Sequence, residues 1–140
     1  MKKIVRLIVL LSILLALDSQ AFAYTQDLAD AEVSPMYIHL MTLSSSLDID
    51  KLGIATCTAK LVQNLGDGSS ELIMNLQKLN SDNTWSSVHT WTKTGLKTCS
   101  DSQYKLVSKG TYRLFVTGKI YDSDGKFVEA GTIYSINKTY

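Results

Sequence analysis

The chain has 140 residues, 45% hydrophobic and 19% charged, and its 14 basic and 13 acidic side chains nearly cancel. The charges are scattered and form no basic stripe, which argues against a nucleic-acid partner and against a polybasic membrane-binding segment. Only two cysteines and two histidines occur, without a shared ligand spacing, so the sequence predicts no metal site and no cofactor.

The N-terminal residues 1–23 have the pattern of a secretory signal peptide, which is helical and is removed on export. A basic start precedes an apolar run over residues 7–17, and residues 21–23 (Ala-Phe-Ala) match the small-x-small pattern that signal peptidase cleaves. An uncleaved anchor is the alternative, but a spanning helix needs about 20 apolar residues. We therefore expect a secreted, extracellular protein without stable membrane insertion.

The sequence after residue 23 predicts a flexible lead over residues 24–35 and one domain over residues 36–140. No helical period is sustained in this domain, whereas apolar and polar residues alternate in short runs between turns. The expected strands cover residues 36–43, 54–63, 71–79, 85–92, 103–107, 112–120 and 127–136. About seven such strands indicate an all-β fold, an antiparallel immunoglobulin-like β-sandwich.

Tyr112 sharpens this expectation because it follows Gly110 and Thr111 at the start of a long strand. A tyrosine in that place can donate its hydroxyl to the preceding loop, which is the tyrosine corner of immunoglobulin-like domains. Those domains carry a cysteine two residues later, where this chain has Leu114. Any bridge here therefore differs from the usual inter-sheet disulfide.

Cys57 and Cys99 are the only cysteines, and outside the cell a lone pair most simply forms a disulfide. Such a bridge would contribute up to about 4 kcal/mol through loop entropy. Cys57 alternates with small residues on an expected core face. Two buried free thiols are the alternative.

Several segments carry a family resemblance: residues 34–37, 53–57, 76–78 and 107–113, together with Trp85, Val88 and Trp91. They resemble a family of small secreted proteins from Gram-positive bacteria that has no established function. The resemblance implies a bacterial source and a secreted β-sandwich. It implies no active site.

No catalytic set is visible, so we expect no enzyme. The acids lie mostly in turns, where solvation explains them. The serines at 44–46 have no activating base, and such a run usually marks a strand end or loop. His89 lies between two tryptophans and is expected to be an ordinary strand residue.

The aromatic side chains give the best candidate binding surface: Phe115, Tyr121, Trp85 and Trp91. Alternation places Phe115 and Tyr121 on the polar face of their strand, whereas Trp85 and Trp91, expected on one face with His89, suit either a platform or the core. The function we expect is a non-catalytic module that binds an extracellular glycan, wall polymer or surface protein. The alternative is a structural protein that self-associates through an exposed strand edge.

Overall fold

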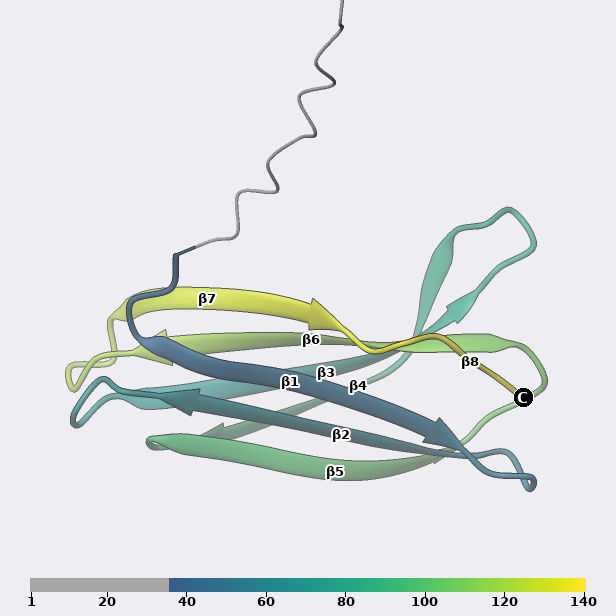
Figure 1. The fold of residues 1–140 in the computed structure, drawn as a ribbon, viewed down its shortest axis with the longest axis horizontal. Helices are drawn as coiled ribbons and strands as arrows, with labels where there is room; N and C mark the ends of the chain where they lie inside the picture. The colour runs from purple at the N-terminus through teal and green to yellow at the C-terminus, as the bar shows by residue number, and fades with distance from the viewer. Residues whose placement is uncertain (1–35) are drawn as a thin grey trace, which may run out of the picture. The chain divides into compact units, whose positions relative to one another are not determined.

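The computed structural model describes residues 36–140, which contain strands and turns and no helix (Figure 1). The expected signal peptide (1–23) and lead (24–35) lie outside the described residues. The strands are β1 (Leu40–Ile49), β2 (Ile54–Gln63), β3 (Ser69–Leu79), β4 (Trp85–Gly95), β5 (Thr98–Leu106), β6 (Thr111–Tyr121), β7 (Phe127–Tyr134) and β8 (Lys138–Thr139). The all-β prediction is confirmed, with a two-residue strand beyond the expected seven.

The strands form two antiparallel sheets that pack face to face in a sandwich-like arrangement. One sheet has the order β1-β2-β5, and the other has the order β4-β3-β6-β7, with β8 paired to β6. The chain therefore crosses from one sheet to the other after β2, after β4 and after β5. In Figure 1 the end of β3 and the start of β4 form a hairpin that projects beyond the sheets.

The core lies between the alternating inner faces of the two sheets. The central strands β2 and β6 alternate without interruption, and their inner hydrophobic side chains are at most 1% exposed: Ala55, Cys57, Ala59, Leu61, Tyr112, Leu114, Val116 and Ile120. The small residues of β2 face larger ones of β6, as close packing requires. Gly118 is the exception on β6, because a Cβ there would collide with the Leu61 side chain of the other sheet.

Two strands differ most from their predicted bounds. β1 starts at Leu40 and continues through the serine run at 44–46, which the sequence predicted as a strand end or loop. β5 starts at Thr98 and contains Cys99, whereas only residues 103–107 were expected. The middle of β1 and most of β5 are polar, and pairing with the full length of β2 fixes these segments despite their weak intrinsic β pattern.

The predicted tyrosine corner is confirmed. The buried Tyr112 hydroxyl donates a hydrogen bond to the Ser108 carbonyl oxygen at 2.7 Å. This bond joins the start of β6 to the loop that leads from the other sheet. It gives a hydrogen-bond partner to a backbone carbonyl group of this crossover loop.

The predicted disulfide is wrong for this fold, because Cys57 and Cys99 are both free and buried. Cys57 lies opposite Gln103, and Cys99 lies opposite Leu61. The two cysteines are thus offset by four residues along neighbouring strands, about 13 Å, whereas a bridge requires Cα atoms within about 7 Å. Burial raises the pKa of the Cys57 thiol to about 12, so this thiol is inert at neutral pH.

Glu129 joins the two sheets on the β1–β7 side. Its carboxylate accepts backbone N–H groups from Ile38 at 2.9 Å, from His39 at 2.9 Å and from Leu40 at 2.8 Å. Burial alone raises the pKa of Glu129, but the three backbone donors outweigh it and hold the pKa below its usual value. The carboxylate thus satisfies donors that have no strand partner on this side.

The edge strands carry features that hinder pairing with another chain. Register shifts interrupt the ladders of β1, β4 and β7. Charged side chains also point inward from the edges: Lys93 and Asp101, which form an ion pair at 3.5 Å, and Glu129. Bulges and inward charges are devices by which natural sheets avoid edge-to-edge association.

Candidate functional site

The outer face of the β4-β3-β6-β7 sheet carries several large aromatic side chains that the core does not use. Residues paired across an antiparallel ladder share a face. Asn75, Phe115 and Tyr134 are paired in one such row, and Gln77 pairs with Arg113 in the next. Leu114 and Val116 point the other way into the core, so this row faces outward.

Four planar side chains pack against one another on this face, and we call them the aromatic stack: Trp85, Arg113, Tyr134 and Phe115. The Arg113 guanidinium carbon lies 4.1 Å from the centre of the Trp85 ring and 4.2 Å from that of Tyr134. The Tyr134 and Phe115 rings stack with their centres 4.7 Å apart and an angle of 26° between planes. The stack therefore draws on three strands, β4, β6 and β7.

Arg113 is held in one orientation within the stack. Its Nε donates to Gln77 Oε1 at 2.8 Å while the two rings cover its faces. Among residues 36–140 it is the only arginine, and it takes part in none of their ion pairs. The site thus holds a fixed positive charge without a carboxylate partner.

Tyr121 lies at the other end of the same face, in a separate cluster. Its ring packs edge-on against Phe127 with centres 6.1 Å apart, and its hydroxyl donates to Glu71 Oε2 at 3.2 Å. Glu71 also accepts a hydrogen bond from Lys119 at 2.9 Å, and this contact holds the pKa of Glu71 below its usual value. Of the predicted surface residues, Tyr121 therefore does not contribute to the stack.

Trp91 does not lie on this face, and the prediction that Trp85, His89 and Trp91 share one face is wrong. Leu76 pairs with His89 but Gln77 pairs with Ser87, so the intervening residue of β4 is bulged and the parity of the strand reverses. Trp85 points outward to Arg113. Trp91 is paired with Met74 and packs against the core, with its ring edge-on to His89 at 4.6 Å.

Sequence reasoning missed Arg113 and Tyr134 as members of the site. Arg113 was placed on the same polar face as Phe115, which was a usable signal. Tyr134 could not be assigned, because its contact with both residues depends on the register of β7 against β6.

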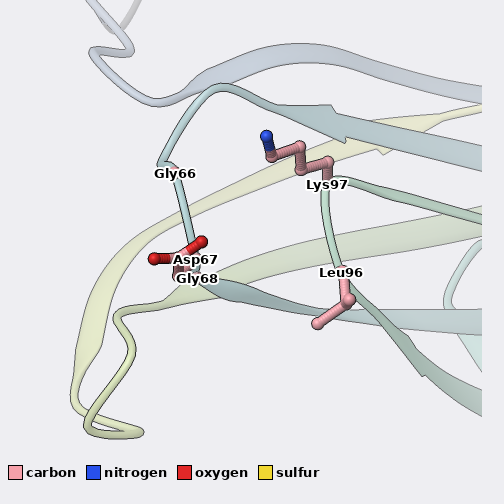
Figure 2. A pocket seen from close by; sticks show the side chains of 5 residues that line it. All are labelled: Gly66, Asp67, Gly68, Leu96 and Lys97. Atoms are coloured by element: carbon pink, nitrogen blue, oxygen red, sulfur yellow. The ribbon is translucent and has the colours of Figure 1, made fainter.

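Of two cavities, the first lies away from the stack and the second borders it at Tyr134. One, of about 370 Å³, opens at the end of the sandwich between the β2–β3 turn, with Gly66 and Asp67, and the β4–β5 turn, with Leu96 and Lys97 (Figure 2). The other, of about 440 Å³, lies between β1 and the β7–β8 segment and is lined by Ser45, Ser46, Leu47, Asp48, Tyr134, Ser135, Ile136 and Lys138. Neither holds a constellation suited to catalysis.

The described part of the chain contains neither a cluster of metal ligands nor a membrane-spanning helix. No group of three or more histidine, cysteine, aspartate or glutamate side chains gathers there in an arrangement that would hold a metal ion. None of its segments is a helix long and apolar enough to cross a membrane.

Comparison with known proteins gives no functional analogy: no protein family and no curated protein sequence matches the chain. The resemblance to a Gram-positive secreted family stays a prediction. The aromatic stack is therefore the feature that points to a function.

Proposed function

We propose that the protein is a secreted, non-catalytic module that binds an extracellular ligand through the outer face of the β4-β3-β6-β7 sheet. The observation that carries the proposal is the aromatic stack, with a guanidinium fixed between Trp85 and Tyr134. Aromatic and arginine side chains are the residues most enriched in the energetic centres of interfaces. Secretion rests on the leader pattern of residues 1–23.

We also infer that the domain is immunoglobulin-like. If the first seven strands are lettered A, B, C, C′, E, F and G, the sheets read A-B-E and C′-C-F-G. Tyr112 then stands at the start of strand F, where a tyrosine corner is expected. In this frame the stack lies on strands C′, F and G.

Self-association through a strand edge is the weaker candidate. It requires a long, flat edge without protective charges. β4 is the longest edge strand at 11 residues, but it is bulged and its Lys93 points inward toward Asp101. These features favour ligand binding over edge pairing.

The test is a glycan and cell-wall binding screen on protein recovered from culture supernatant. We expect binding, and we expect Trp85→Ala with Phe115→Ala to abolish it while the protein stays folded. Tyr104→Ala is the matched control, because Tyr104 is 68% exposed on the outer face of the other sheet. Binding that survives the double substitution, or is equally lost in the control, would place the site elsewhere.

A further inference from the structure

Contacts within the aromatic stack cover the faces of its two inner members, Arg113 and Tyr134. Tyr134 has Arg113 on one face and Phe115 on the other, yet it is 51% exposed. Its exposed surface is therefore the ring edge and the hydroxyl. A neutral sugar that binds by stacking on an aromatic face has no free face at the centre of this site.

The exposed edges are electropositive. The quadrupole of an aromatic ring places its positive potential at the edge, and the guanidinium of Arg113 adds a full charge between two such edges. Within residues 36–140, the hydrogen bond of Arg113 uses Nε, and no acceptor binds its terminal NH₂ groups. A guanidinium fixed in this way offers paired donors to a carboxylate or sulfate.

Glu71, the acidic residue that the strands place on this face, is too distant to neutralise Arg113, and Asp82 in the β3–β4 turn is bound by Thr84. Glu71 lies opposite Lys119, six residues along β3 from the Gln77–Arg113 pair, which corresponds to about 20 Å. Its charge is already compensated by Lys119 at 2.9 Å. The stack therefore presents an uncompensated positive site.

Amide and hydroxyl side chains continue the surface beside the stack. Gln77 is paired with Ser87, and Asn75 is paired with Thr90, whose Oγ1 accepts a hydrogen bond from Asn75 Nδ2 at 3.1 Å. Asn75 Oδ1 is buried, so the groups that suit a ligand rich in hydroxyls are the Gln77 Nε2 amide and the hydroxyls of Ser87 and Thr90. A row of them beside a fixed guanidinium matches a sugar polymer that carries acidic groups.

We propose that the ligand of the aromatic stack is an acidic polysaccharide, whose carboxylate or sulfate groups bind the terminal NH₂ groups of Arg113. This inference rests on the proposed binding function and specifies its ligand class. Neutral glycans lack the carboxylate or sulfate that Arg113 would bind. Acidic peptides lack the density of hydroxyls that Gln77, Ser87 and Thr90 would bind.

The test measures binding of the secreted protein to three soluble polysaccharides, polygalacturonate, dextran sulfate and neutral dextran, and to an acidic peptide, polyglutamate. We expect binding to the two acidic polysaccharides, weakened by salt, and none to dextran. Arg113→Met should weaken binding about tenfold or more, as loss of a charge-assisted hydrogen-bond pair implies. Arg113→Lys keeps the charge without the planar donor pair and should also bind more weakly.

Lys119→Met is the matched control, since it removes one positive charge from the same face. It should leave affinity within about twofold, because the site is local. Equal loss in Lys119→Met and Arg113→Met, or unchanged affinity in Arg113→Lys, would overturn the inference in favour of diffuse charge attraction. Binding to neutral dextran or to an acidic peptide alone would overturn it and leave the binding function standing. Binding to no polymer in either screen would overturn both.

Discussion

The two outer faces of the sandwich carry opposite chemistry on the same kind of strand. The outer face of β1-β2-β5 is built mainly from short hydroxyl side chains: Thr42, Ser44, Ser46, Thr56, Thr58, Thr98, Ser100 and Ser102. Its largest side chains, Tyr104 and Leu106, are 68% and 72% exposed at one end. The outer face of β4-β3-β6-β7 instead holds the aromatic stack.

This difference shows which features the fold requires. Threonine-rich surfaces suit a pleated, solvated face, and the three-stranded sheet is stable with them. The other sheet therefore does not need an ordered stack of four planar groups in order to form. Large apolar side chains on a solvated face contribute little unless they contact one another or a partner. The stack meets the first of these conditions through its own contacts, and we propose an extracellular ligand as the partner that meets the second.

The largest expected effect is a loss of stability caused by a substitution in the core between the two sheets. Gly118→Ala places a methyl group against Leu61 of the opposite sheet and 3.0 Å from Leu43 Cδ1. We expect a loss of about 2–3 kcal/mol in the free energy of unfolding, because the packed core has no room to relax. Chemical denaturation followed by tryptophan fluorescence measures the change.

Gly66→Ala is the control for that substitution, because a Cβ at Gly66 meets nothing within 4 Å. It should leave the denaturation midpoint nearly unchanged. Equal stability of the two variants would mean that the sheets can separate locally at Gly118 without affecting the rest of the domain.

The sequence alone predicts the central strands of the core and the hydrogen bond of the Tyr112 hydroxyl. The unbroken alternation in residues 54–63 and 112–120 predicted β2 and β6, because both are central strands with one buried face. Tyr112 was predicted from its position at a strand start, and the Ser108 carbonyl accepts its hydroxyl as expected. These features depend on local pattern alone.

The candidate site depends on the pairing registers between strands, and the local sequence pattern of a single strand does not determine them. A single bulged residue in β4 reverses the direction of Trp85 relative to Trp91, and no turn residue marks it. Likewise Cys57 and Cys99 share the inner face of one sheet, but the β2–β5 register keeps them four residues apart. Only the assembled sheet shows which outward aromatics meet Arg113.

A pair of tyrosine substitutions compares the two faces directly. Tyr134→Thr removes the ring that contacts both Arg113 and Phe115. The loss of one cation–π contact and one aromatic pair should cost about 1–2 kcal/mol. Tyr104→Thr makes the same chemical change on the opposite face and should stay within about 0.5 kcal/mol. Equal losses in the free energy of unfolding, measured by urea denaturation, would show that the contacts of Tyr134 within the stack do not stabilise the fold.

The smallest expected effect concerns the charges at the far end of the stack face. The Lys119 hydrogen bond lowers the pKa of Glu71 from its usual value of 4.5. A carboxyl whose folded-state pKa is lowered stabilises the protein above the unfolded-state pKa, and this stabilisation is lost as pH falls through the folded-state value. Glu71→Gln should therefore lower the melting temperature slightly at pH 7, and the difference from the wild type should vanish under acid conditions.

Glu129 also has a lowered pKa, but it is present in both proteins and its acid loss cancels in that difference. Asp48→Asn is the control on the opposite face, where the carboxylate is 77% exposed and 3.7 Å from Lys138. Such a pair is screened by solvent, so its loss should leave the melting temperature nearly unchanged at every pH. Melting curves between pH 7 and pH 3 measure all three proteins. A Glu71→Gln difference that persists at the lowest pH would mean that the side chain stabilises this face by packing, and that its charge contributes nothing.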